Sequence, residues 1–397
     1  MAFHELLMPQ RIVYGQGSFA EVGQEARRLG QKALLISDPV MEKVGNVAAC
    51  EEHLQAQGLV CVTYAKVDSE PTDIHLAEAL ALCWDERCDV IVAVGGGSCL
   101  DTAKAVALLM TNEGQIAEYV AKAKTVVNKP LPLIAVPTTA GTGSEVTKMT
   151  VITDTARQVK MMLADPALLP HAAIVDPLLS VSCPPNVTAA TGIDALCHAI
   201  EAYLSRRAQP ATDIWARTAI ELIATHLRRA YEDGADFEAR DKMAFASMLA
   251  GAAFSNASVA LVHGMSRPIG AVFHVPHGIS NAMLLPAVLA YTKEAAVGRL
   301  AEIGRLMQPE IKALSDEQAA EATIEEIKSL CLDLHIPSLR HWGIDQQAFQ
   351  KAAPKMAVDA LASGSPGNNP KIPTVEEIVR LYHIAYDYDF RGKLQNA

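Results

Sequence analysis

Short apolar runs and longer amphipathic stretches alternate along the first 178 residues of this chain. The apolar runs are rich in β-branched residues, which predicts strands, and the stretches between them show helical spacing. The predicted strands are Arg11–Tyr14, Ala33–Ser37, Val60–Tyr64, Asp89–Val94, Leu133–Pro137 and Ala172–Val175. The predicted helices are Ser18–Leu29, Met41–Ala56, Thr72–Cys83 and Cys99–Met110. This βα alternation predicts an α/β domain built on a parallel sheet.

The pattern changes after Asp176-Pro177, where strand-like runs give way to long Ala-, Leu-, Ile- and Glu-rich segments. The helices expected there are Asn186–Ser205, Pro210–Asp233, Glu238–Phe254, Asn256–Phe273, Gly278–Leu289, Ala295–Leu306 and Thr374–Asp387. The low-complexity stretch Ser363–Pro370 predicts a surface loop before the last of them. We therefore expect an α/β domain at residues 1–178 and an all-helical domain at residues 179–397, with a ligand cleft between them.

Composition narrows the range of partners. The 397 residues include 34 Lys and Arg against 45 Asp and Glu, a net charge of −11. Nucleic acids and anionic membranes both require clustered positive charge, so neither is expected as a partner. No apolar run approaches the roughly 18 residues of a membrane span, and the first ten residues do not resemble a signal peptide. The eight cysteines form no CxxC pair, which indicates reduced thiols and a cytoplasmic protein.

A glycine-rich turn follows the fourth predicted strand. Gly95, Gly96 and Gly97 allow a tight turn and a close ligand approach, and Ser98 is expected to cap the next helix, whose N-terminus attracts phosphate. The GxGxxG fingerprint fails because Leu100 occupies the third glycine position, and no Walker A lysine follows. An ordinary βα turn explains this element equally well.

A second polar turn, Pro137–Thr147, also follows an apolar strand and offers many hydroxyl and amide donors. Two such turns indicate two sides of one nucleotide site. Asp38, just beyond another strand, can accept ribose hydroxyls and would repel a 2′-phosphate, although a surface aspartate is nearly as good an interpretation.

A carboxylate and several histidines form a candidate metal site in the helical half. Asp194 and His198 stand at i and i+4 and share one helix face. His263, His274 and His277 lie within fifteen residues of apolar sequence, where unpartnered imidazoles would be costly. One carboxylate with two or three imidazoles suits Fe(II), Zn(II) or Mn(II) better than Mg or Ca. Satisfied core histidines are the alternative.

With these motifs identified, the chain resembles the iron-containing (group III) alcohol dehydrogenase family over nearly its whole length. The resemblance is most specific at Gly95–Lys104, Pro137–Glu145, Asp194…His198 and His263…His277. It implies an N-terminal nucleotide-binding domain of modified Rossmann type and a helical C-terminal domain, a dehydroquinate synthase-like architecture.

Position by position, the resemblance implies four metal ligands: Asp194, His198, His263 and His277. It implies cofactor contacts from Asp38, Gly96, Gly97, Ser98, Asp101, Thr138, Thr139, Thr142, Thr147, Val151, Lys160 and Leu179. Among these, Asp38 matches the carboxylate that favours NAD over NADP.

Three positions depart from the family pattern. Glu70 stands where the family often has Asn. His274 matches a position that is not always His and is expected beside the metal ligands rather than among them. Arg267 replaces a His that relays the alcohol proton in many members, and arginine cannot act as a base at neutral pH. The relay is then expected to use His274, water or ribose hydroxyls. Arg267 either anchors an anionic substrate group or makes a structural ion pair.

The resemblance implies an NAD-dependent enzyme that transfers hydride between NAD(H) and a primary alcohol or aldehyde whose oxygen binds Fe²⁺, or Zn²⁺ as the alternative. It also implies a homo-oligomer, a dimer or larger. Three other functions stay open on the sequence: a zinc polyol (glycerol-type) dehydrogenase or related NAD-using lyase, a reductase for an anionic aldehyde held by Arg267, and a non-catalytic nucleotide-binding scaffold.

Overall fold

The computed structural model describes residues 4–392. The chain divides into two compact units, Met1–Cys183 and Pro184–Ala397. The predicted boundary after residue 178 falls inside the short 3-10 helix η4 (Pro177–Ser180). Each unit has its own core, and the α/β and all-helical classes expected for the two halves are confirmed.

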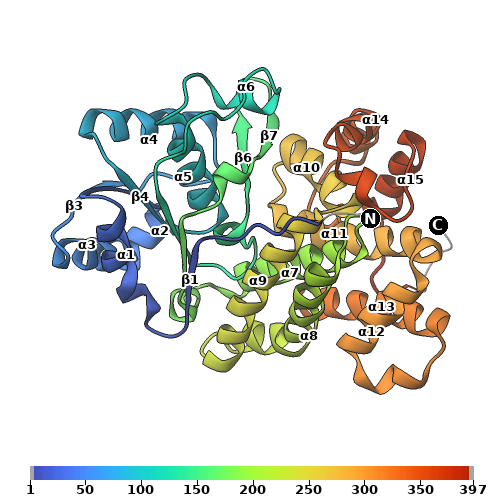
Figure 1. Cartoon of the computed structure of the whole chain (residues 1–397). Coiled ribbons are helices and arrows are strands. Elements are labelled where there is room, and N and C mark those ends of the chain that lie inside the picture. Colours follow the sequence, from blue (N-terminus) through green and yellow to red (C-terminus); the bar gives the residue numbers. More distant parts are fainter. Residues whose placement is uncertain (1–3, 393–397) are drawn as a thin grey trace. The chain divides into compact units, whose positions relative to one another are not determined.

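The first unit is built on a six-stranded parallel sheet with the order β1-β8-β5-β4-β2-β3. Figure 1 labels β1, β3 and β4 of this sheet. Its strands are β1 (Arg11–Tyr14), β2 (Lys32–Ile36), β3 (Val60–Tyr64), β4 (Val90–Gly95), β5 (Leu133–Pro137) and β8 (Ala172–Val175). All six were predicted to within one residue. The central strands are buried on both faces, which explains why they appear in the sequence as continuous apolar runs rather than alternating ones.

Helices cover both faces of this sheet. They are α1 (Val22–Leu29), α2 (Pro39–Lys43), α3 (Asn46–Ala56), α4 (Asp73–Glu86), α5 (Gly97–Leu109) and α6 (Ile116–Val120). One core joins α1 and α3 to the side chains of Ala33 and Leu35, and another joins α4 and α5 to Leu34 and Ile36. The side chains of β2 thus alternate between two cores, as the period of a strand requires.

The strand order reverses between β2 and β4. The connection after β2 leads outward to β3, whereas the connections after β4 lead the other way to β5 and then β8. In open α/β sheets, ligands bind in the crevice at the carboxyl ends of the two strands flanking such a reversal. Asp38 follows β2 and Gly96 follows β4, so the topology itself places these two residues at the expected crevice.

The prediction missed an antiparallel hairpin, β6 (Met149–Asp154) and β7 (Val159–Ala164), which forms a separate two-stranded sheet. It was also wrong to join Met41–Ala56 into one helix. Gly45 has a φ of 89°, a left-handed conformation that ends α2 and begins α3.

The second unit contains only helices among its described residues, 184–392. They are α7 (Pro185–Leu204), α8 (Pro210–Glu232), α9 (Phe237–Ala257), α10 (Leu261–Phe273), α11 (His277–Thr292), α12 (Val297–Met307), α13 (Asp316–Asp333), α14 (Gln346–Ala362) and α15 (Val375–Tyr386). Helices α13 and α14 were not predicted. The remaining 3-10 helices of the chain are η1 (Ser18–Glu21), η2 (Ser144–Val146), η3 (Pro166–Leu168), η5 (Lys293–Ala295), η6 (Pro309–Ala313) and η7 (Ser365–Asn368).

Two expectations for this unit are corrected. The predicted helix Asn256–Phe273 is interrupted, because Ser258 has a φ of 69° and α10 starts only at Leu261. The predicted surface loop Ser363–Pro370 is partly buried and contains η7. Asn369 is only 3% exposed, and its amide donates to Thr292 Oγ1 and to the carbonyl of Lys371. Polar composition indicated a loop correctly but not its burial, since the side chains find partners inside the unit.

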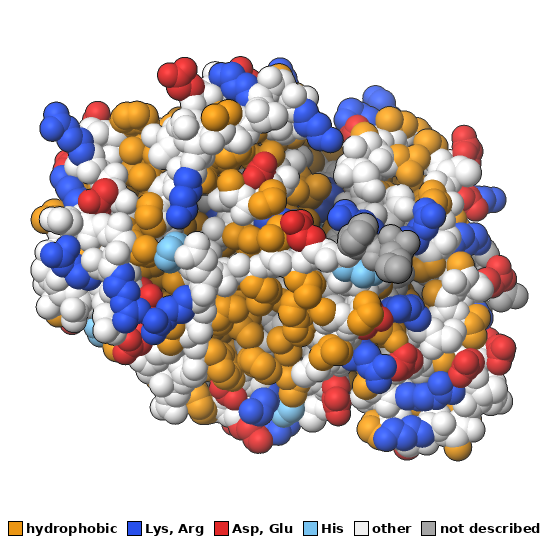
Figure 2. Space-filling model, viewed as in Figure 1, with side chains coloured by type: hydrophobic (Ala, Val, Ile, Leu, Met, Phe, Trp, Pro, Cys, Tyr) orange, Lys and Arg blue, Asp and Glu red, His pale blue; other side chains and the backbone are white. Residues whose placement is uncertain are grey.

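Among the described residues, no single helix is both long and apolar enough to cross a membrane; α9 and α10 pass that test only as a pair, bent by 102°. Figure 2 shows Lys and Arg side chains interspersed with Asp and Glu on the face drawn, as expected for this balance of charges.

Candidate metal centre and nucleotide site

Three helices of the second unit carry the predicted metal ligands. Asp194 and His198 lie one turn apart on α7 and are 2% and 4% exposed. His263 is in the first turn of α10, and His277 begins α11. A Cβ at Gly278 would collide with the backbone of α7 at Ala190, so this glycine lets α11 approach α7 closely enough to bring His277 to Asp194.

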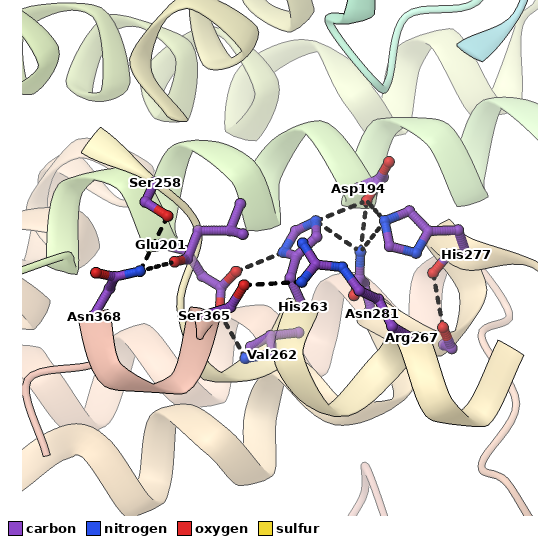
Figure 3. A network of polar contacts seen from close by, with 12 residues as sticks. Asp194, Glu201, Ser258, Val262, His263, Arg267, His277, Asn281, Ser365 and Asn368 are labelled. Atoms are coloured by element: carbon purple, nitrogen blue, oxygen red, sulfur yellow. Dashed lines mark hydrogen bonds and ion pairs between the residues drawn. The ribbon is translucent and has the colours of Figure 1, made fainter. Parts of the chain in front are cut away.

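The four ligand side chains converge. One donor atom from each of Asp194, His198, His263 and His277 lies within 4.8 Å of the others, a group called the donor cluster below. His263 Nε2 and His277 Nε2 lie 3.6 and 3.8 Å from Asp194 Oδ1 (Figure 3). Ligands at 2.0–2.2 Å from a metal are at most about 4.3 Å apart, so only a small contraction would be needed to coordinate one ion.

Charge in this cluster is arranged for a cation. Burial raises the pKa of Asp194, but the surrounding imidazoles, His198 first, outweigh that effect and leave the pKa well below its usual range. Burial lowers the pKa of His263, yet the carboxylates of Glu201 and Asp194 outweigh it and raise that pKa. An ionised carboxylate with three imidazoles is a donor set that fits Fe(II) or Zn(II) and is unsuited to Mg²⁺ or Ca²⁺.

Two further residues complete the site, and sequence reasoning missed both. Asn281, one turn after His277, donates from Nδ2 to Asp194 Oδ1 at 2.7 Å, and the same nitrogen lies 3.1 Å from His263 Nε2. Glu201, one turn after His198, lies 2.5 Å from His263 Nδ1. Their signal in the sequence was a polar residue at helical spacing from a ligand, in an otherwise apolar helix face.

Arg267, the predicted anion anchor or ion-pair residue, and His274, the predicted proton relay, lie in different environments. Arg267 follows His263 by one turn and donates from Nη1 to Ser365 Oγ at 2.9 Å. Burial lowers its pKa to about 10 while the charge of Glu201 raises it, so Arg267 remains a cation at neutral pH. His274 is exposed at the C-terminal end of α10, with a φ of 54°, and it is not part of the donor cluster.

In the first unit, the two predicted polar turns lie against each other. A Cβ at Gly97 would be 2.7 Å from Thr142 Cγ2, and one at Gly96 would be 3.6 Å from Thr139 Cγ2. Asp38 lies beside the same turn, since its Oδ2 accepts from Cys99 Sγ at 3.5 Å. Asp38 Oδ1 accepts from the backbone N–H of Val40 and of Met41 and so caps α2.

The prediction that Ser98 caps α5 is wrong. The N-cap is Gly96, no side chain caps the helix, and Ser98 is already in its first turn. The uncapped amides therefore stay available for an anion, which a capping serine would have occupied.

A buried lysine links several of the other predicted residues. Lys104 Nζ donates to Ser144 Oγ, Thr147 Oγ1 and the carbonyl of Met149 at 2.8–2.9 Å. Asp101 accepts from Ser144 Oγ and from the backbone N–H of Val151. Below, "lysine network" means Lys104, Asp101 and these partners. Asp101, Thr147 and Val151 therefore make internal contacts, and nothing in the sequence had pointed to Lys104 as their centre.

The remaining predicted cofactor residues lie apart from that network. Thr138 is 2% exposed at the end of β5, and Leu179 packs in the core that contains α1 and α3. Lys160, on β7, is bound by both carboxylate oxygens of Glu70 at 2.7–2.8 Å. The departure from the family pattern at Glu70 thus has a visible consequence, a partly exposed ion pair at Lys160.

Comparison with known proteins agrees with these features. Residues 9–177 match the sequence profile of iron-containing alcohol dehydrogenases, and residues 188–386 match that of the C-terminal part of the Fe-containing alcohol dehydrogenase family. The 1,3-propanediol dehydrogenase of Klebsiella pneumoniae is 39% identical over 386 residues, which cover 96% of this chain and 98% of that protein.

Solved structures give the same result. A 1,3-propanediol oxidoreductase superimposes with a TM-score of 0.92 at 39% identity, over 97% of this chain and 100% of that one. A sulfoacetaldehyde reductase from Bifidobacterium kashiwanohense, solved in complex with NAD⁺, superimposes with a TM-score of 0.86 at 28% identity over 98% of this chain and 100% of that one.

Proposed function

The chain belongs to the iron-containing alcohol dehydrogenase family and is an oxidoreductase, and from that premise we propose that it uses NAD(H) and Fe²⁺ to interconvert a small neutral primary alcohol and its aldehyde. The observation that carries this proposal is the buried convergence of Asp194, His198, His263 and His277. A scaffold protein without catalytic activity would have no need to bury four such groups against one another. The relatives reported above are alcohol dehydrogenases and aldehyde reductases, so the comparisons favour neither a scaffold protein nor a zinc polyol dehydrogenase.

The chain's own residues prepare the metal site. A divalent ion held by the donor cluster would supply a Lewis acid, which lowers the pKa of an alcohol and polarises an aldehyde carbonyl. Phe254 stacks on the ring of His198 at a centroid distance of 4.2 Å and thereby holds the ring and keeps water from that side. Asn281 orients Asp194 by the hydrogen bond to Oδ1.

For the nucleotide, we assign the pyrophosphate to the free amides at Gly96, Gly97 and Ser98 at the start of α5. Asp38 would accept the ribose hydroxyls and disfavour NADP by repelling its 2′-phosphate. The remaining predicted cofactor residues would line the rest of the nucleotide site. They are Thr138, Thr139, Thr142, Lys160 and Leu179. Asp101, Thr147 and Val151 would shape the second turn through their contacts with the lysine network.

For the alcohol's proton, the exposed imidazole of His274 is our candidate for exchange with solvent, because Arg267 keeps its own proton at neutral pH. The variant His274→Ala should lower kcat while leaving the affinity for metal unchanged, and added imidazole should restore part of the rate. A rate unaffected by this substitution would assign the proton to water or to the ribose hydroxyls.

The test is an anaerobic assay of the purified protein, reconstituted with Fe²⁺ and followed by NADH absorbance. We expect turnover of 1,3-propanediol with NAD⁺ well above that with NADP⁺, and a turnover reduced by about a thousandfold or more in Asp194→Asn. Sulfoacetaldehyde, as an anionic aldehyde, should be a poorer substrate than lactaldehyde, and Arg267→His should not change that ratio. A preference for the anionic aldehyde that disappears in Arg267→His would replace the neutral substrate with an anionic one.

We also propose a cytoplasmic location and assembly into a homo-oligomer. All eight cysteines are free thiols, which fits a reducing compartment. Strand β1 lies at one edge of the main sheet, the position at which a second chain can extend a sheet. Light scattering coupled to size-exclusion chromatography measures the assembly directly.

A further inference from the structure

Glu201 connects the metal-binding face of α7 to the start of α10. The residue is 3% exposed, and it follows Asp194 by seven residues and His198 by three, so it lies on the same helix face. Its two carboxylate oxygens have different partners. Oε1 accepts from the backbone N–H of Val262 at 2.6 Å, and Oε2 faces His263 Nδ1 at 2.5 Å (Figure 3).

The first of these contacts caps α10. No side chain of the chain segment before α10 caps that helix, and Val262 is its second residue, where an N–H has no partner within the helix. A carboxylate supplied by another helix satisfies this N–H and is itself stabilised by the helix dipole. The interrupted chain at Ser258–Ala260 is thereby held against α7.

The second contact decides which nitrogen of His263 carries the proton. An ionised carboxylate only accepts hydrogen bonds, so Nδ1 must be the donor. The lone pair of the neutral ring is then on Nε2, the atom that lies 3.6 Å from Asp194 Oδ1. A carboxylate partner of this kind also makes the ring a better ligand.

We propose that Glu201 is a positioning residue that sets the tautomer of His263 and thereby creates a ligand at Nε2. One carboxylate does this and caps α10 at once, so the ligand and the helix that bears it are placed by the same group. The inference rests on the proposed function, in that it takes the donor cluster to bind a divalent metal.

The substitution Glu201→Gln isolates the effect. Glutamine has one acceptor oxygen and one NH₂ group, while two N–H donors face this position. The backbone N–H of Val262 cannot change, so the amide oxygen should turn to it and the NH₂ to His263. The ring must then present Nδ1 as an acceptor and carry its proton on Nε2, where it blocks metal binding.

The matched control is Glu377→Gln. Glu377 likewise accepts from a backbone N–H at a helix start, that of Thr374, and from a side chain, the hydroxyl of Tyr291. It belongs to α15 and not to the donor cluster. It therefore reports what the loss of a helix-capping carboxylate away from the donor cluster does to the fold.

The affinity of metal-free full-length protein for Co²⁺ should be measured by calorimetry for the wild type and both variants, with circular dichroism as the check on folding. We expect Glu201→Gln to weaken Co²⁺ binding about 10- to 100-fold and Glu377→Gln to change it less than about twofold. Equal Co²⁺ affinity in wild type and a folded Glu201→Gln would overturn the inference. A wild type that binds no metal would instead overturn the proposed function.

A measurement on the wild type covers the case in which Glu201→Gln does not fold. In metal-free, ¹⁵N-histidine-labelled protein at pH 8, the resonances lost in His263→Gln should be those of a ring with a proton on Nδ1 and none on Nε2. A proton on Nε2 of that ring would contradict the inference without recourse to any Glu201 variant.

Discussion

The lysine network of the first unit and the donor cluster of the second are both buried groups of polar side chains. They differ in the balance between hydrogen-bond donors and acceptors. Lys104 is 1% exposed and all three of its ammonium hydrogens have acceptors in the protein. In the donor cluster, Asn281 Nδ2 lies 2.7–3.3 Å from Asp194 Oδ1, His263 Nε2 and His277 Nε2, and its two hydrogens cannot satisfy all three atoms. The first arrangement is complete and stabilises the fold, whereas the second collects acceptors and therefore suits a cation.

The largest effect should come from breaking the donor cluster. Asp194→Asn removes the one carboxylate among the ligands, and we expect kcat/KM with Fe²⁺ to fall by about a thousandfold or more, which corresponds to about 4 kcal/mol of lost transition-state stabilisation. NADH affinity, measured by fluorescence titration, should stay within about twofold. Metal-dependent activity near that of the wild type would place the catalytic ion elsewhere.

Breaking the lysine network should cost stability rather than metal affinity. Lys104→Met leaves Asp101 and three acceptors without their cation, and such losses destabilise by about 3–5 kcal/mol. For a unit of this size, each kcal/mol lowers Tm by about 2–4 °C. Calorimetric unfolding measures the shift, with Co²⁺ affinity as the parallel readout. Were metal binding to weaken as strongly as stability, the two clusters could not be treated as independent.

The pH dependence of stability sharpens the comparison, because Glu145 is buried beside Lys104. Burial raises its pKa to about 7, with its own backbone N–H and Lys104 opposing the shift. The folded state then holds this proton between about pH 4.5 and 7 while the unfolded state loses it, so the group makes stability fall as pH rises through that window. Glu145→Gln should remove the loss, on the order of 1–3 kcal/mol. Urea midpoints from pH 5 to 8 give the difference, and parallel curves for both proteins would contradict it.

The smallest effect is expected at Glu70, whose pairing with Lys160 is partly exposed. Glu70→Asn should change stability by less than about 1 kcal/mol. It should tighten NADH binding by less than about fivefold, because freeing one lysine charge in the proposed site of an anionic cofactor gains about 1 kcal/mol at most. The control is Glu86→Gln, which breaks the similar pair with Lys32. NADH affinity that is weakened in Glu70→Asn would show that Glu70 itself helps to hold the nucleotide.

Much of the fold could be predicted from the periodicity of apolar residues. The six strands of the main sheet were predicted because they are buried on both faces and appear as continuous apolar runs. The hairpin β6–β7 was missed because it is half-buried, with burial alternating along short segments that contain Thr, Lys and Asp. The break before α10 was missed because it depends on one left-handed residue, Ser258, in an apolar context that continues on both sides.

The candidate ligands could also be predicted from the sequence, since helical spacing puts Asp194 and His198 on one face, and the family motifs supplied His263 and His277. The residues that contact these ligands could not be predicted in this way. Glu201 meets His263 across 62 residues, and Lys104 meets Ser144 across 40. Local spacing carries no information about such pairs.

The sequence by itself determined the two kinds of domain and the positions of the two polar turns, because these follow from short-range periodicity, and its family resemblance supplied the proposed ligand set. Only the tertiary structure decided that Asp101 supports a loop from within, that Ser98 does not cap α5, and that one carboxylate from α7 both caps α10 and orients its histidine. Those outcomes depend on which buried donor finds which acceptor, and packing between elements distant in sequence settles that choice.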